Sequence, residues 1–143
     1  MFKFTCFVFY ITYAVCTQAE SDSSESNELF DKFMPECMDE FNVKEEDFDG
    51  VVKSGDVTKI DPCYWGCYYT RMGLLNDKGQ YDLNSFQTTM KKIMKDDEDY
   101  SSLEKIARKC ESVKDEAVSD GEAGCKRGAL LAACFLKNKG DII

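Results

Sequence analysis

The sequence predicts a single all-α domain of six helices, stapled by disulfide bonds. The chain has 143 residues, which is room for one domain. Apolar residues recur at intervals of three and four in most segments, and no segment alternates with a period of two. Eight cysteines are present, an unusual number for a chain of this length unless they form disulfides.

The first 19 residues have the composition of a secretory signal peptide. Lys3 supplies a positive charge, residues 4–15 are almost wholly apolar, and Thr17-Gln18-Ala19 resembles a cleavage site. We expect cleavage after Ala19, with cleavage after Cys16 as the second choice. The alternative is a membrane anchor, but this apolar run is too short to span a bilayer. The mature protein is therefore predicted to be secreted and extracellular.

Composition excludes several classes of function. The net charge is −9, and loss of Lys3 makes it 17 − 27 = −10, which disfavours nucleic acids and anionic membranes. The chain has no histidine, so it lacks the base of a Ser-His-Asp or Cys-His enzyme and the His-Asp pair of a secreted phospholipase. Zinc is also disfavoured, because close Cys-x2-Cys pairs are missing too. We expect no enzymatic activity, no metal and no cofactor.

The first half of the mature chain contains an acidic lead-in and two helices. Residues 20–28 are rich in serine and acidic residues, which predicts disorder. The folded domain is expected over 29–143. Its first helix follows from apolar residues between Phe30 and Phe41, with a kink or a later start at Pro35. A short second helix is expected around residues 48–52, followed by a connector at Gly55.

Four further helices are expected in the second half. Asp61-Pro62 is a good helix start, with Asp as the N-cap, and that helix is expected to reach about Leu75. A turn follows over 76–79, and then an amphipathic helix over 83–94. Capping boxes at Ser101-x-x-Glu104 and Ser119-x-x-Glu122 predict the starts of the last two helices. The last one is expected to end near Asn138 and to be central and buried.

Six cysteines remain after signal cleavage, and an even number in a secreted chain predicts three disulfides. Cys63 and Cys67 lie one turn apart with nearly parallel side chains, a poor geometry for a bond. Cys125 and Cys134 point to opposite faces of a helix. Excluding these two local pairs leaves ten of the 15 connectivities open. The six residues are Cys37, Cys63, Cys67, Cys110, Cys125 and Cys134.

The cysteine spacing x25, x3, x42, x14 and x8 resembles that of the insect odorant-binding proteins, of the pheromone- and general-odorant-binding type. The stretches Asp61-Pro62-Cys63-Tyr64-Trp65-Gly66-Cys67 and Met72-Gly73-Leu74-Leu75-Asn76-Asp77-Lys78-Gly79 also look like the third helix of that family and the turn after it. The resemblance covers roughly Leu29 to Ile143. It implies the disulfides Cys37–Cys67, Cys63–Cys125 and Cys110–Cys134.

The same resemblance implies an apolar cavity enclosed by the six helices. The expected occupant is a small hydrophobic molecule, such as an odorant, a pheromone or a similar lipid, which the protein carries through an aqueous secretion. A membrane receptor is the second partner that this class suggests. The ligand-binding residues implied by position are Leu83, Phe86, Met90, Ile106, Ala107, Leu130, Ala133, Ile142 and Ile143.

Two further features have competing interpretations. The chain ends Gly140-Asp141-Ile142-Ile143, which suits a short flap that closes the cavity, or else a frayed end. Tyr64, Trp65, Tyr68 and Tyr69 cluster on one expected helix, and we interpret them as helix packing rather than as a carbohydrate or stacking site.

Two rival functions remain open at this point. One is the same carrier outside olfaction, and the other is a secreted protein-interaction or toxin-like module with a solid core.

Overall fold

The computed structural model describes residues 30–141. In this range it contains six α-helices and four short 3-10 helices, and its one extended pairing is an isolated bridge between Leu75 and Tyr81. The expected all-α, disulfide-linked bundle is confirmed, while the enclosed cavity stays a prediction. The signal peptide (1–19), the acidic lead-in (20–28), Ile142 and Ile143 lie outside the described residues.

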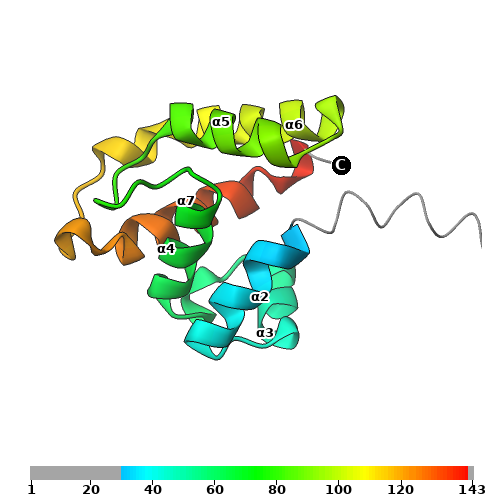
Figure 1. Cartoon of the computed structure of the whole chain (residues 1–143). Helices are drawn as coiled ribbons and strands as arrows, with labels where there is room; N and C mark the ends of the chain where they lie inside the picture. The colour runs from blue at the N-terminus through cyan, green and yellow to red at the C-terminus, as the bar shows by residue number, and fades with distance from the viewer. Residues whose placement is uncertain (1–29, 142–143) are drawn as a thin grey trace, which may run out of the picture.

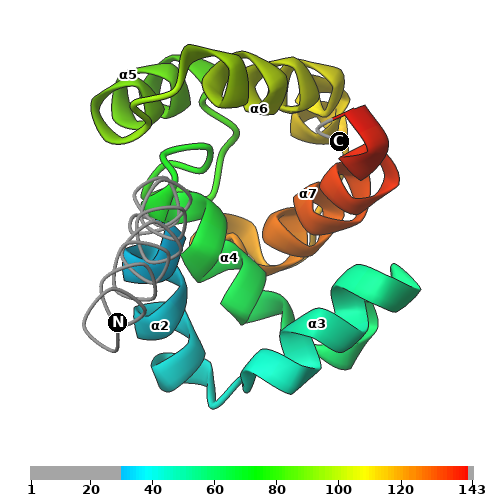
Figure 2. The same cartoon turned by 90° about the vertical axis from the view of Figure 1, so that its right-hand side faces the viewer.

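The six helices form a layered arrangement. Figures 1 and 2 show α5 and α6 side by side on one side of the molecule, α2 and α3 on the other, and α4 and α7 between them. No helix within 30–141 has both the length and the apolar character needed to cross a bilayer. The helices are α2 (Phe30–Phe41), α3 (Glu45–Ser54), α4 (Pro62–Arg71), α5 (Leu83–Ile93), α6 (Asp97–Lys109) and α7 (Cys125–Lys137).

The most extensive helix pair is α4 against α7, and small residues allow their backbones to touch. Gly66 of α4 faces Gly128 of α7, and a Cβ atom added to Gly128 would lie 2.4 Å from the backbone nitrogen of Gly66. A Cβ atom on Gly66 would meet the carbonyl oxygen of Gly124 at 3.0 Å. The crossing therefore depends on the absence of side chains at these positions.

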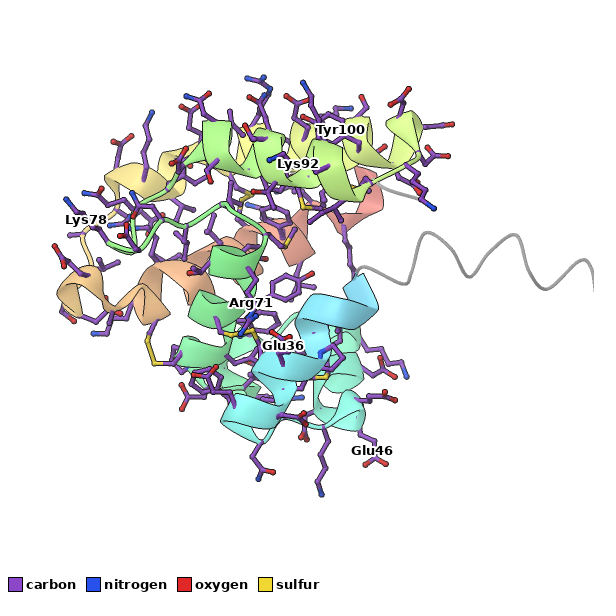
Figure 3. All side chains as sticks on the ribbon, in the orientation of Figure 1. Glu36, Glu46, Arg71, Lys78, Lys92 and Tyr100 are labelled. Carbon is purple, nitrogen blue, oxygen red and sulfur yellow. A yellow bond between two sulfur atoms is a disulfide. The ribbon has the colours of Figure 1, made fainter. Side chains whose placement is uncertain are left out.

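In the described part of the chain, three disulfides tie the layers together, and Figure 3 draws disulfides as yellow bonds. Their pairing is the one that the resemblance implied. Cys37–Cys67 joins α2 to α4, Cys63–Cys125 joins α4 to α7, and Cys110–Cys134 joins the end of α6 to α7. An exposed ion pair between Arg71 and Glu36 adds a second link between α4 and α2, with the two side chains pointing toward one another (Figure 3).

The start of α4 agrees with the prediction, but its end does not. The Asp61 carboxylate accepts a hydrogen bond of 2.8 Å from the Cys63 backbone N–H, and Pro62 occupies the first helical position. The helix ends at Arg71 instead of near Leu75. Gly73 adopts a φ of 82°, and this left-handed conformation stops the helix. The buried backbone after it then turns back toward the start of α5.

Both capping boxes were wrong as helix starts. The helix α6 begins at Asp97, because the Asp96 carboxylate accepts hydrogen bonds from the backbone N–H groups of Glu98 and Asp99 before Ser101 is reached. A 3-10 turn at Gly121–Ala123 takes the place of a helix start near Ser119.

The last helix begins later than predicted because of the backbone conformation of the residue before it. Gly124 has a φ of 74°, so α7 begins only at Cys125. Asp120 caps this end by accepting a hydrogen bond of 2.9 Å from the Lys126 backbone N–H. The predicted end of the helix near Asn138 is correct, since Asn138 is the C-cap residue.

The first helix continues through Pro35, which lies inside α2. The predicted short second helix is α3, and Gly55 ends it in the left-handed conformation expected of a helix C-cap. The turn over 76–79 is also present, closed by a 3.0 Å hydrogen bond from the Gly79 N–H to the Asn76 carbonyl.

Candidate functional site

The interior between the layers is a core of apolar and aromatic side chains. In the range that the structure describes, no polar or charged residue belongs to the buried class. Four of the predicted ligand-binding residues lie in this interior: Phe86 and Met90 on α5, and Ile106 and Ala107 on α6. Their exposed fractions are 0%, 2%, 0% and 0%.

The other predicted residues lie at its margin or outside it. Leu83 and Leu130 are partly buried against the same apolar cluster. Ala133 is exposed on α7. Ile142 and Ile143 fall outside the described residues, so the structure gives no position for the last part of the predicted flap.

Local sequence explains how α5 presents its apolar face. The Asp82 carboxylate caps the helix by accepting a hydrogen bond of 2.9 Å from the Ser85 N–H. Phe86 and Met90 are four residues apart, so they lie on the same face, one above the other.

Polar contacts hold α6 beside α5 and beside the segment that precedes α5. The Tyr81 hydroxyl donates a 2.5 Å hydrogen bond to the Ala107 carbonyl, and the Gln87 side-chain amide donates to the Glu104 carboxylate. This amide is the main reason that the pKa of Glu104 lies below its usual value.

The aromatic residues of α4 form one ring cluster, in agreement with the packing interpretation. Trp65 contacts Tyr64 edge-on at 5.0 Å between ring centroids, and Tyr69 packs on Phe135 of α7 at 5.2 Å. The Trp65 indole N–H donates to the Val57 carbonyl at 3.4 Å, which satisfies its polar group inside the fold. The cluster thus belongs to the core and joins α4 to its neighbours.

One buried polar atom of this aromatic cluster has no hydrogen-bond partner among the described residues. Tyr64 is fully buried, and its hydroxyl makes no hydrogen bond with any described residue. Burial is also the main cause of the raised pKa of Tyr64, so the phenol stays protonated at neutral pH. An unpaired buried hydroxyl is unfavourable by about 1–3 kcal/mol. The Tyr64 hydroxyl is therefore a buried donor without a partner among the described residues.

Replacing Tyr64 by phenylalanine should stabilise the ligand-free protein. The change keeps the ring contacts and removes the unpaired hydroxyl, so we expect a gain of about 1 kcal/mol in the free energy of unfolding. Urea denaturation of the unaltered protein and of Tyr64→Phe measures this change in the free energy of unfolding. Tyr81→Phe is the matched control. Tyr81→Phe removes a bonded hydroxyl and should destabilise the protein by about 1 kcal/mol. A loss of stability for Tyr64→Phe would show that its hydroxyl has a partner.

A groove on the surface was not predicted from the sequence. It has a volume of about 520 Å³ and is lined by α2 and α3 residues, none of them among the predicted binding residues. Met34 and Met38 of α2 and Phe48 of α3 give it an apolar floor. The helical spacing of these residues in the sequence indicated only that they are buried. The groove itself could not be predicted, because it depends on how the two helices pack against each other.

No group of three or more His, Cys, Asp or Glu side chains within 30–141 could hold a metal ion.

Within residues 30–141, six helices, three interlocked disulfides and an apolar core define a small, disulfide-linked, all-α domain. The chain belongs to the PBP/GOBP family, the insect odorant-binding proteins, since the family model matches residues 19–138. Members of this family are secreted, soluble proteins that bind small odorants or pheromones and are not enzymes. The searches of curated proteins and of solved structures gave no significant match.

Proposed function

We propose that this protein is a secreted carrier that holds a small hydrophobic molecule in the interior bounded by α4, α5, α6 and α7. Its ligand is an odorant, a pheromone or a similar lipid, which it carries through an aqueous secretion toward a membrane receptor. The observation that carries the proposal is the interior itself, which in a member of an odorant-binding family contains no buried charged residue among those described.

The energetics of such a ligand are consistent with reversible transport. Full burial of a chain of ten carbons contributes about 8 kcal/mol, at about 0.8 kcal/mol per CH2 group. The loss of translational and conformational freedom on binding offsets part of this free energy. The tightest binding that we expect is therefore micromolar. A carrier with such an affinity can both take up its ligand and release it.

Mass spectrometry of lipids that co-purify with natively secreted protein tests the proposal. A carrier should contain a stoichiometric apolar molecule, and after delipidation it should bind a fluorescent apolar probe that long-chain alcohols displace. A protein with a solid core, as expected for a toxin-like module, would carry no lipid and bind no probe. The chemistry of the recovered molecule would also separate an olfactory carrier from one in another secretion.

Substitutions on α5 test the position of the ligand. We expect Phe86→Ala and Met90→Ala to weaken binding of a long-chain apolar ligand by about 1–3 kcal/mol, because each removes a large side chain that faces the interior. Tyr69→Ala should have a smaller effect on affinity. Titration with the fluorescent probe measures the affinity of each variant, and circular dichroism verifies its fold.

A matched control comes from the same helix. Lys92 is exposed on α5, so Lys92→Ala should leave the affinity unchanged. Milder changes, Phe86→Leu and Met90→Leu, keep the test valid if an alanine variant does not fold. Wild-type affinity in both of these folded variants would place the ligand elsewhere.

Removal of the chain end tests the flap. The 3-10 helix Lys139–Asp141 packs against α6 and α7, and the Lys139 ammonium donates a 2.5 Å hydrogen bond to the Val52 carbonyl of α3. These contacts support a tail that lies against the domain. We expect deletion of 140–143 to reduce ligand affinity about threefold or more, which corresponds to the loss of one apolar contact. Unchanged affinity on titration would identify the tail as a frayed end.

A further inference from the structure

The groove between α2 and α3 has the size of a small-molecule site. Its volume of about 520 Å³ lies within the range of about 300–1,000 Å³ that ligand pockets occupy. Met34, Pro35 and Met38 line it from α2, and Glu45, Phe48 and Asp49 line it from α3. It is separate from the interior residues on α5 and α6, because none of them lines it.

The floor of the groove is apolar and anchored to the core. Met34, Met38 and Phe48 are each partly buried, and the Phe48 ring packs on Trp65 of α4 at 6.0 Å between centroids. Methionine side chains are unbranched and polarizable, so they adapt to occupants of different shape. This floor would accept an alkyl chain or an aromatic ring.

The rim of the groove has two carboxylates that form no ion pair with the residues whose side chains are described. Glu45 and Asp49 are both exposed, and neither forms an ion pair or a side-chain hydrogen bond with another residue in 34–140. They lie four residues apart on α3, where like charges on one helix face repel each other. The helix dipole favours Glu45 in the first turn, but it does not explain Asp49 in the second.

We propose that this groove binds a small apolar molecule that carries a protonated amine. The apolar part lies on Met34, Met38 and Phe48, and the ammonium group lies beside the carboxylates of Glu45 and Asp49. Charge complementarity selects this occupant: a neutral molecule gains only the floor, and an anion is repelled by the rim and by the net charge of −9. The site is a second one, beyond the interior that we propose for the transported ligand.

Octylamine and 1-octanol are suitable probes, because they have the same chain and differ in charge. We expect octylamine to bind the full mature protein about threefold to tenfold more tightly than octanol at low salt. Exposed charge pairs are weak and are screened by salt, so this preference should shrink at 0.5 M NaCl. Titrations followed by NMR should show the amine shifting the Met34 and Met38 methyl signals.

A charge-matched pair of variants separates the groove from the general field of an acidic protein. Glu46 is the next residue on α3, does not line the groove, and points away from the molecule (Figure 3). Glu45→Gln and Glu46→Gln change the net charge equally. We expect Glu45→Gln to reduce the preference for the amine, the double variant Glu45→Gln/Asp49→Asn to abolish it, and Glu46→Gln to keep it.

Three results would overturn the proposal. The first is equal affinity of the unaltered protein for octylamine and octanol. The second is an equal loss of preference in Glu45→Gln and Glu46→Gln, which would assign it to net charge alone. The third is an amine that shifts the signals of Phe86 and Met90 instead of the groove methionines, which would place it in the interior.

Discussion

Gly128→Ala is expected to destabilise the protein by about 4 kcal/mol or more, enough to leave much of it unfolded. The new Cβ atom would lie 2.4 Å from the Gly66 nitrogen and 2.6 Å from the Trp65 carbonyl carbon. Both are backbone atoms of α4, so no side-chain rotation relieves the overlap. The two helices must separate, and they form the most extensive contact of the fold. Chemical denaturation followed by circular dichroism measures the effect.

Gly50→Ala is the matched control for this prediction. Gly50 lies inside α3, and a Cβ atom added there meets nothing within 4 Å. Alanine favours the helix over glycine by about 0.5–1 kcal/mol, so this variant should be as stable as the unaltered protein or slightly more stable. Native-like stability of Gly128→Ala would mean that α4 and α7 do not cross at these glycines.

Removing the Cys63–Cys125 disulfide should have the second large effect. The double variant Cys63→Ala/Cys125→Ala opens the longest of the three loops, with a sequence separation of 62. The chain-entropy model gives a loss of about 4 kcal/mol for a loop of this length. The bond also lies beside the glycine crossing, so α4 and α7 lose a covalent link where their backbones touch. Thermal and urea denaturation of the folded fraction measure the loss.

The pair Cys110→Ala/Cys134→Ala is the comparison for loop length. Its sequence separation is 24, for which the same model gives a loss smaller by about 0.8 kcal/mol. Peptide mapping should find no free thiol among the six cysteines of the unaltered protein, and the other two bonds intact in each variant. A loss below 1 kcal/mol for the Cys63–Cys125 pair, or a bond between Cys63 and Cys67, would contradict this account.

Local features of the sequence were sufficient for most of the secondary structure. The Asp61-Pro62 start of α4, the turn over 76–79 and the amphipathic face of α5 depend on residues close together in the chain, and all agree with the structure. The capping boxes failed because competing local signals were stronger. Asp96 caps two N–H groups ahead of Ser101, and Gly124 interrupts the segment after Ser119.

The disulfide pairing could not be predicted from the spacing of the cysteines alone. Spacing alone excluded two local pairs and left ten connectivities open, because the pairing depends on which helices lie side by side. The resemblance to a family, and not local geometry, pointed to the pairing that the structure contains.

By itself, the sequence determined the all-α class and the six helices found within 30–141, since both follow from hydrophobic periodicity. The tertiary structure alone decided that Gly66 and Gly128 meet, that the Tyr64 hydroxyl is unpaired, and that α2 and α3 enclose a groove with an acidic rim. These features join residues that are distant in sequence or that lie on different helices. Their positions depend on how the helices pack, which hydrophobic periodicity does not specify.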